Sequence, residues 1–180
     1  MKEIHLFIAT SLDGFIARED GSLDWLVNIP NPSQTDHGYN EMIANTDVIV
    51  MGRKTYNEIL GFGIEWPYEN CNTYVVTGNP DFFPSTANTF VLYKIDAGTI
   101  QFLKNQSSKN IWLAGGGSLV TQFLNLGAID EMTISIVPLI LGKGIRLFPD
   151  ESVETQFETI KTELFDTGIV NLVYRKKSEI

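Results

Sequence analysis

The stretch Asn110 to Leu126, NIWLAGGGSLVTQFLNL, joins a buried-strand pattern to an apolar-periodic helix through three consecutive glycines. Three glycines remove every Cβ between the strand and the helix, so a ligand can approach the main chain closely. The N–H groups around Gly116, Gly117 and Ser118 would face such a ligand, with the positive end of the helix dipole behind them. The stretch therefore predicts an anion-binding cradle. The alternative is a tight turn in which Ser118 is an ordinary N-cap.

The rest of the chain repeats this alternation of strand and helix. Strands are expected from residue 4 to a turn at 11–14, and at 15–17, 47–51, 73–77, 89–92, 111–114 and 131–137. Helices are expected near 39–43, after residue 52, and at 96–106 and 118–126. Such alternation implies right-handed crossovers and a largely parallel sheet, which is the α/β class. Residues 157–164 and 168–175 predict an antiparallel strand pair at one edge.

Composition limits the possible functions. A chain of 180 residues that is 43% hydrophobic suits a single domain over residues 1–180 with a continuous core. The net charge of −9 argues against nucleic acid or an anionic membrane surface as a partner. One cysteine, Cys71, and two distant histidines, His5 and His37, predict neither a disulfide nor a metal site. The N-terminus carries no targeting pattern, so we expect a cytoplasmic protein.

A second glycine lies at the end of another core strand. The segment Asp47 to Tyr56, DVIVMGRKTY, places Gly52 at the carboxyl end of a strand, where open α/β sheets bind ligands. Arg53 and Lys54 follow at a helix N-terminus, which is an unfavourable place for cations unless an anion lies beside them. A 2′-phosphate would supply that anion. The alternative is a solvated basic pair on the first turn.

Four motifs occur in an order that resembles the dihydrofolate reductase superfamily. They are HLFIATSLDGFIA, VIVMGRKTY, VVTGNP and AGGGSLVTQFL. The segment IDEMTISIVPLILGKGIRLF is similar to the branch that also forms the reductase domain of bifunctional riboflavin-biosynthesis deaminase-reductases. The resemblance implies a dihydrofolate-reductase-like three-layer fold with a mostly parallel central sheet and antiparallel C-terminal strands.

The resemblance also implies NADPH as the cofactor. Ala9 and Ile16 match positions at which the family packs the nicotinamide. The motif from Gly52 through Arg53 and Lys54 to Thr55 matches the pyrophosphate and 2′-phosphate side. The strand end matches at Thr77 and Gly78, near the adenosine phosphate, and the loop under the pyrophosphate matches at Gly115, Gly116, Gly117, Ser118 and Leu119.

Two residues are expected on the catalytic side. Asp36 takes the place of the helix carboxylate that binds the pterin and assists its protonation in dihydrofolate reductases, and Thr133 takes the place of its hydroxyl partner. Desolvation in an apolar cleft would raise the pKa of Asp36, which suits proton delivery. The competing interpretation is that Asp36 only caps a helix that starts at His37.

Two further residues are candidates for substrate binding. Asp13 could line the pocket, although an Asp-Gly pair in a tight turn needs no function. Trp25 flanks a loop that would cover the substrate, although such an aromatic more often plugs the core.

Some positions depart from the family. Asn70, Cys71 and Asn72 stand where dihydrofolate reductases carry an arginine that clamps the folate glutamate, and Val120 replaces a tyrosine that leans on the cofactor ring. Ile59 and Leu60 replace an acidic residue of the riboflavin-type domains.

These observations predict an NADPH-dependent reductase of a small planar nitrogen heterocycle of pterin or pyrimidinone type. One alternative is an NADP(H)-binding module or sensor that has lost turnover, and a further one is a plain dihydrofolate reductase. A homodimer is also expected, because the riboflavin-type branch commonly pairs through its reductase domain. The apolar run of Ile134, Ile136, Val137, Leu139, Ile140 and Leu141 would form the interface, unless the final strand pair buries it.

Overall fold

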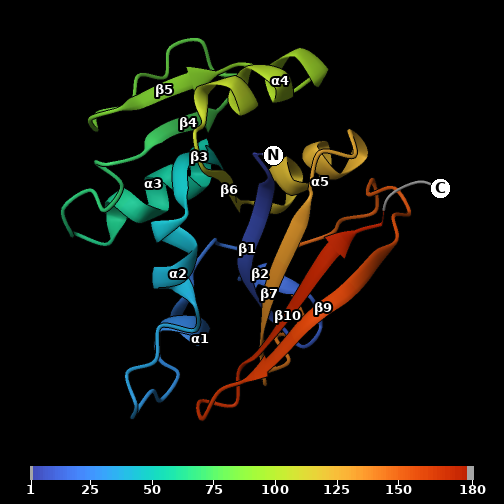
Figure 1. Cartoon of the computed structure of the whole chain (residues 1–180). Helices are drawn as coiled ribbons and strands as arrows, with labels where there is room; N and C mark the ends of the chain where they lie inside the picture. The colour runs from blue at the N-terminus through green and yellow to red at the C-terminus, as the bar shows by residue number, and fades with distance from the viewer. Residues whose placement is uncertain (1, 178–180) are drawn as a thin grey trace.

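The computed structural model describes residues 2–177 and is built on an eight-stranded sheet (Figure 1). The strand order is β5-β4-β3-β6-β1-β7-β10-β9. The strands are β1 (Ile4–Ser11), β3 (Thr46–Gly52), β4 (Asn72–Val76), β5 (Thr89–Leu92), β6 (Asn110–Gly115), β7 (Glu131–Val137), β9 (Phe157–Leu164) and β10 (Val170–Lys176). A separate antiparallel ribbon joins β2 (Phe15–Ala17) to β8 (Ile145–Arg146).

The sheet has the expected mixed topology. Strands β5, β4, β3, β6, β1 and β7 pair in parallel, whereas β10 is antiparallel to both β7 and β9. The α/β class, the mostly parallel sheet and the antiparallel C-terminal strands are thus confirmed. The carboxyl ends of β3 and β6 lie side by side, so both glycine motifs reach the same edge of the sheet.

Helices cover both faces of the sheet. The helices are α1 (Asp24–Val27), α2 (Tyr39–Ala44), α3 (Arg53–Gly61), α4 (Ala97–Gln106) and α5 (Gly117–Asn125). Val48 and Val50 of β3 point into a core shared with α4 and α5, and the alternate residues Ile49 and Met51 point into a core beside α2 and α3. This alternation produces the three layers.

The helix expected near 39–43 is present, and the structure differs from the two alternatives in how the helices begin. Helix α2 begins at Tyr39 rather than His37, and its N-cap is Gly38 in the left-handed region. Helix α5 begins at Gly117 with Gly116 as its N-cap and without a side-chain cap, so Ser118 is not the N-cap. Sequence periodicity gave no indication of the four-residue helix α1, which is too short for a helical repeat to show.

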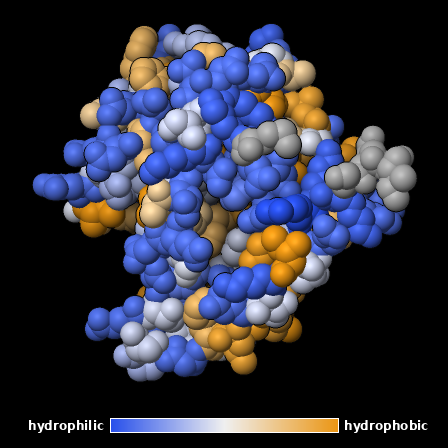
Figure 2. Space-filling model, viewed as in Figure 1, coloured by the Kyte–Doolittle hydropathy of each residue, from blue (hydrophilic) through white to orange (hydrophobic). Residues whose placement is uncertain are grey.

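The visible face in Figure 2 is mainly hydrophilic, with separate groups of hydrophobic residues between the charged ones. In the part of the chain that the structure describes, no helix combines the length and apolarity needed to cross a membrane. The single domain over residues 1–180 stays a prediction, and the sheet that uses strands from both ends of the chain supports it.

Candidate functional site

The two glycine motifs meet at the carboxyl edge of the sheet. Met51 of β3 pairs with Gly115 of β6. A Cβ placed on Gly52 would lie 3.9 Å from the carbonyl oxygen of Gly115 and 3.9 Å from the nitrogen of Gly116. The two strand ends at which the sequence predicts a ligand crevice therefore adjoin, with peptide backbone on both sides, and a ligand site there stays a prediction.

The structure requires glycine at Gly115 and at Gly117, for different reasons. Gly115 has a φ of +106°, a conformation that favours glycine, and its peptide bond to Gly116 is cis. A Cβ on Gly117 would overlap the carbonyl oxygen of Arg146, next to β8. Both glycines are thus required by the chain itself.

Gly52 and Gly116 have no such internal requirement. Their φ values are −75° and −80°, which any residue adopts. The nearest atoms to a Cβ on Gly116 would be Ile16 Cδ1 at 3.8 Å and Thr55 Oγ1 at 3.9 Å, which is ordinary contact. The chain would therefore accept a side chain at both positions, and the open backbone there is available to a ligand.

Other expected cofactor residues surround this loop. Ile16 and Thr55 both lie next to Gly116, although they come from β2 and α3. Ile8 Cδ1 lies 3.2 Å from the Cβ position of Gly115, and Ala9 follows on the opposite face of β1. The structure thus brings Ile8, Ile16 and Thr55 to the glycine loop from three separate elements, whereas no contact of Ala9 with the loop is observed among the described residues.

The basic pair is placed as expected. Arg53 and Lys54 are exposed in the first turn of α3, which contains no acidic residue. Neither side chain takes part in an ion pair with another residue of the described range 2–177. Two cations thus stand at a helix N-terminus without a protein anion that would offset the dipole.

The remaining cofactor candidates differ in their burial and in the groups that they expose. Thr77 is buried just after β4, where its Oγ1 accepts a hydrogen bond from Asn79 N at 3.1 Å. Gly78 is exposed, and a Cβ there would meet nothing within 4 Å. Ser118 is exposed, whereas Leu119 is buried in the core, so Leu119 offers a ligand only its backbone.

The expected pKa of Asp36 was wrong. Its carboxylate is exposed and accepts hydrogen bonds from Asn40 N at 2.8 Å and Gly38 N at 3.1 Å. These two N–H groups, Asn40 first, hold the pKa of Asp36 below its ordinary value. The carboxylate therefore caps the first turn of α2, and desolvation does not raise its pKa as the sequence analysis expected.

Asp13 is held by the protein. Ser11 Oγ donates to its carboxylate at 2.6 Å, and Leu141 N and Gly142 N donate at 3.0 and 2.7 Å. These bonds, the one from Ser11 first, lower the pKa of Asp13 to about 2. Asp13 thus fastens the turn after β1 to the loop after β7, and substrate contact by Asp13 stays a prediction.

Trp25 is part of the core. It is buried with Val137 and Ile169, and its Nε1 is enclosed without a hydrogen-bond partner among the described residues. This position agrees with an aromatic plug over the core, and substrate contact by Trp25 is an untested expectation. Val120, a residue of α5, is likewise fully buried.

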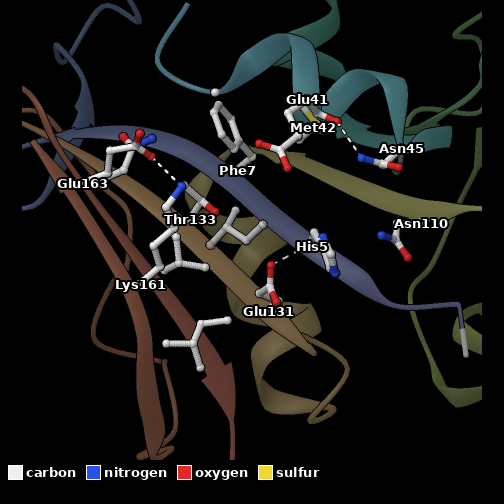
Figure 3. Close-up of a pocket in the computed structure, with 15 residues that line it drawn as sticks. His5, Phe7, Glu41, Met42, Asn45, Asn110, Glu131, Thr133, Lys161 and Glu163 are labelled. Carbon is white, nitrogen blue, oxygen red and sulfur yellow. Dashed lines mark hydrogen bonds and ion pairs between the residues drawn. The ribbon is translucent and has the colours of Figure 1, made fainter. Parts of the chain in front are cut away.

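A cavity of about 310 Å³ lies between α2 and the strands β1, β7, β10 and β9 (Figure 3). Its apolar wall includes Phe7, Met42 and Val173. Thr133, the expected hydroxyl partner of Asp36, lines this cavity, whereas Asp36 is not among its lining residues, and a catalytic role of Thr133 stays a prediction. The polar wall consists of His5, Glu41, Asn45, Asn110, Glu131, Lys161, Glu163 and Asn171.

The cavity lies along β1 from His5 to Phe7, and the carboxyl edge of the sheet, where the glycine loop lies, is beyond Phe7. Phe7 and Ala9 are two residues apart, so they share a face of β1 about 7 Å apart. Phe7 pairs with Thr133, and Ala9 pairs with Ser135. A ligand stacked on Phe7 would therefore have Ala9, the expected nicotinamide neighbour, at one end.

Asn171 anchors the segment that leads into α2. Ser135 Oγ donates to its Oδ1 at 2.6 Å, and its Nδ2 donates to the carbonyl oxygen of His37 at 2.7 Å. His37 has a φ of 54° and packs edge-on against Phe165. These contacts fix α2 over the cavity, and sequence reasoning missed them because they join residues about 130 positions apart.

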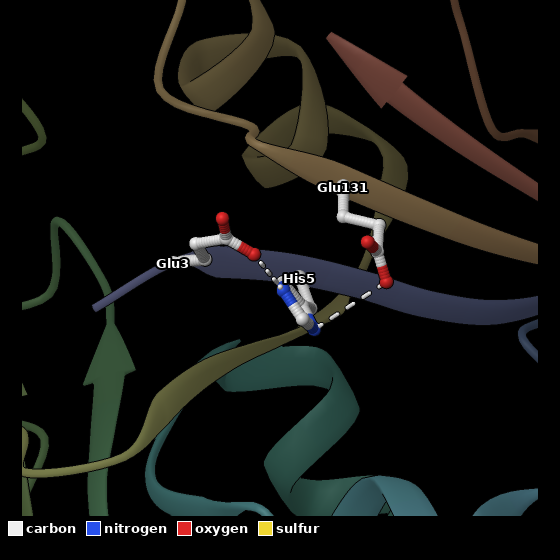
Figure 4. A group of neighbouring side chains, drawn as sticks. All are labelled: Glu3, His5 and Glu131. Atoms are coloured by element: carbon white, nitrogen blue, oxygen red, sulfur yellow. Dashed lines mark hydrogen bonds and ion pairs between the residues drawn. The ribbon is translucent and has the colours of Figure 1, made fainter. Parts of the chain in front are cut away.

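Glu3, His5 and Glu131 form a cluster at the amino ends of β1 and β7 (Figure 4). His5 Nε2 lies 3.0 Å from Glu3, and its Nδ1 lies 3.9 Å from Glu131. Glu131 also accepts from Arg175 at 2.7 Å. The two carboxylates face different ring nitrogens of His5, and one ligand atom from each of the three residues lies within 4.8 Å of the other two.

A mostly parallel sheet with antiparallel C-terminal strands, in which two strand-glycine-helix motifs meet at the carboxyl edge, has the architecture of a dihydrofolate-reductase-like protein. The family profile described as RibD C-terminal domain matches residues 86–171. The uncharacterized protein YwjB of Bacillus subtilis (strain 168) is 38% identical over 164 residues, which cover 91% of this chain and 92% of YwjB.

Solved structures agree with this fold. A candidate riboflavin biosynthesis protein from Shewanella sp. PV-4 superimposes with a TM-score of 0.89 at 32% identity, over 98% of this chain and 99% of that protein. Dihydrofolate reductase from Enterococcus faecalis, complexed with NADP(H), gives a TM-score of 0.70 at 17% identity, over 98% and 97% of the chains.

The bifunctional diaminohydroxyphosphoribosylaminopyrimidine deaminase/5-amino-6-(5-phosphoribosylamino)uracil reductase of Thermotoga maritima gives a TM-score of 0.70 at 19% identity. The match covers 98% of this chain but 57% of that protein. The chain belongs to the dihydrofolate reductase-like superfamily, in the branch of the RibD C-terminal domain. This branch and the neighbouring proteins are of the reductase type.

Proposed function

We propose that this protein is an NADPH-dependent reductase of a small planar nitrogen heterocycle. The observation that carries the proposal is the meeting of Gly52 and Gly116 at adjoining strand ends. Neither φ nor packing within the chain requires a glycine at either position. Backbone left open in this way suits the close approach of a pyrophosphate.

The residues around the loop fit the rest of NADPH. Arg53 and Lys54 would hold the 2′-phosphate at the N-terminus of α3, since charge-assisted bonds to phosphate are strong there. Ala9 and Ile16 would pack against the nicotinamide. Thr77 and Gly78 would lie near the adenosine phosphate, at the end of the neighbouring strand β4.

The cavity beside α2 would hold the acceptor. When bound, NADPH supplies a hydride from C4 of its nicotinamide. Phe7 and Val173 would orient a planar ring, and the Thr133 hydroxyl would bind one of its polar atoms. Asn171 would keep α2 over the ring and limit the entry of water.

The proton source is the open part of this mechanism. Asp36 is exposed, caps α2 and has a lowered pKa, so the physical basis for a proton donor at this position is lost. This observation favours one second candidate, an NADP(H)-binding module or sensor without turnover. An Asp36→Asn variant with an unaltered rate would leave Asp36 as a helix cap, whereas a rate loss of about 100-fold would assign it to catalysis.

A screen of NADPH oxidation tests the proposal. The panel contains dihydropterins, dihydrofolate, aminopyrimidinone compounds and simple quinones. We expect oxidation with at least one heterocycle and loss of that activity in Gly116→Ala. If NADPH binds but no acceptor is reduced, the sensor function replaces the reductase. We also propose a cytoplasmic location, and we propose a homodimer on the evidence of the apolar run 134–141.

A further inference from the structure

The cavity beside α2 carries a negative charge. Carboxylates reach its wall from three elements: Glu41 of α2, Glu131 of β7 and Glu163 of β9 (Figure 3). Lys161 contributes an ammonium group. Three carboxylates and one ammonium group give these lining side chains a net charge of −2, which Arg175, paired with Glu131 from outside the lining, reduces to −1.

The positive charge in this wall is already paired. Lys161 Nζ lies 2.7 Å from Glu163, so its ammonium offers little to an anionic ligand unless that pair breaks. Glu131 is paired with Arg175 on its other side, at 2.7 Å. Glu41 takes part in no ion pair with the residues that the structure describes, and it is exposed at the opening.

Arginine, the usual ligand of a phosphate ester, is not among the described lining residues. The sequence contains four arginines, and each has another place in the structure. Arg18 pairs with Asp24, Arg175 pairs with Glu131, Arg146 lies over the Phe15 ring at 4.9 Å, and Arg53 stands beside the glycine loop. A phosphorylated substrate would thus enter a negative cavity without a free cation to receive it.

The same wall suits a ligand that donates hydrogen bonds. Glu41 and Glu163 offer carboxylate oxygens, and Thr133 adds a hydroxyl, around an apolar slot formed by Phe7 and Val173. Carboxylate oxygens accept from amino and ring N–H groups of a heterocycle. The side chains of Lys161 and Glu163 are 58% and 44% exposed, so the charge of this wall acts on a ligand through partly solvated groups and is screened by salt.

We infer that the substrate is an uncharged or cationic aminoheterocycle that carries no phosphate. This inference rests on the proposed function, which makes the cavity the acceptor site. It separates this chain from the Thermotoga maritima reductase, whose described substrate is a phosphoribosylaminouracil. The fold and the proposed cofactor cradle that the two proteins share would then act on substrates of different charge.

A matched ligand pair tests the inference. The probes are 5-amino-6-(ribosylamino)uracil and its 5-phosphate, titrated calorimetrically into the full chain with and without saturating NADPH. We expect the unphosphorylated compound to bind about tenfold more tightly or better, and we expect added salt to narrow the difference. Equal or tighter binding of the phosphate, or no binding of either compound, would overturn the inference.

Charge-neutralising variants identify the residues responsible. The double variant Glu41→Gln with Glu163→Gln should bring the two dissociation constants close together, and Glu154→Gln, an exposed carboxylate outside this cavity, should leave the ratio unchanged. A ratio unaffected by the double variant would refute the role of the wall charge. NADPH binding, measured separately, reports on the proposed function: its absence contradicts the reductase, whereas a preference for the phosphate contradicts only the substrate class.

Discussion

Gly116 and Gly117 are adjacent in the chain, but the structure explains the glycine differently at each position. A Cβ on Gly117 would overlap the backbone of Arg146, whereas a Cβ on Gly116 would make ordinary contacts with Ile16 and Thr55. Packing therefore explains Gly117, and we propose that the approach of a ligand explains Gly116. The sequence alone could not make this distinction, because β8 packs on the loop from about 30 residues away.

This difference predicts that one substitution lowers stability and the other abolishes NADPH binding. Gly117→Ala should destabilise the fold by about 1–3 kcal/mol, because the added methyl group overpacks the contact with β8. Gly116→Ala should stay within about 1 kcal/mol of wild type but lose the rise in melting temperature that saturating NADPH produces. Thermal unfolding with and without NADPH measures both effects. A Gly116→Ala protein that NADPH stabilises as it does wild type would place the cofactor elsewhere.

Asp13 predicts a pH dependence of stability. Its pKa of about 2 in the folded protein lies below the ordinary value of 3.8, chiefly because Ser11 donates to the carboxylate. A lowered pKa adds stability above about pH 4, and this stability is lost as the pH falls toward 2. The melting temperature of Asp13→Asn should therefore lie below that of wild type at neutral pH, and the difference should shrink between pH 4 and 2.

The control for Asp13 is Asp150→Asn, which changes an exposed loop carboxylate. A difference between wild type and Asp13→Asn that stays constant from pH 5 to 2 would show that the carboxylate charge is not what holds the two loops together.

At the scale of elements, the sequence predicted β3 and the start of α3, where we propose that the cofactor binds. The strand-glycine-helix pattern at 47–56 predicted both β3 and the start of α3, since periodicity and a glycine boundary are local properties. The cavity wall was not predicted in the same way. Glu41, Lys161 and Glu163 come from α2 and β9, and only the strand order places them together.

Asp36 shows the limit of transferring a residue by its place in a motif. The resemblance to dihydrofolate reductases places a carboxylate at the start of α2, and Asp36 does lie there. Its carboxylate, however, accepts hydrogen bonds from the N–H groups of Gly38 and Asn40 and so caps the helix. The role of a carboxylate depends on its burial and hydrogen bonds, which depend on how the helix begins. That geometry depends on Gly38 and on the contact between Asn171 and His37.

Arg53 at the N-terminus of α3 should determine the choice of cofactor. A charge-assisted bond to the 2′-phosphate is worth about 1.5–3 kcal/mol, which is about ten- to hundredfold in dissociation constant. Arg53→Gln should therefore weaken NADPH binding by about that factor and leave NADH binding nearly unchanged. Lys177→Gln, at an exposed position on the opposite part of the chain, is the control. Equal losses of affinity for NADPH and NADH would indicate that Arg53 has a structural role instead.

At the scale of the molecule, the apolar run 134–141 is only partly accounted for by the core. Ile134 and Val137 pack inside, and β10 covers one edge of β7. Leu139 and Ile140 are 38% and 70% exposed, and Leu12, which bonds to Leu139 through its backbone, is 59% exposed. These three side chains form a candidate contact surface that the single chain leaves open.

We predict a homodimer through this surface, which would bury on the order of 1,200 Å² or more in total. Light scattering at micromolar concentration should give about twice the chain mass of 20.2 kDa. Ile140→Glu should shift the protein toward the monomer, because it would bury an unpaired charge in the interface. A wild-type mass near 20 kDa would contradict the dimer.

The most direct test of the central claim is a fluorescence titration of the wild-type chain with NADPH and NADH. The open backbone at Gly52 and Gly116 predicts that both dinucleotides bind, and the basic pair at the start of α3 predicts that NADPH binds at least about tenfold more tightly. Equal dissociation constants, or no binding of either cofactor, would contradict the assignment of this site to NADPH.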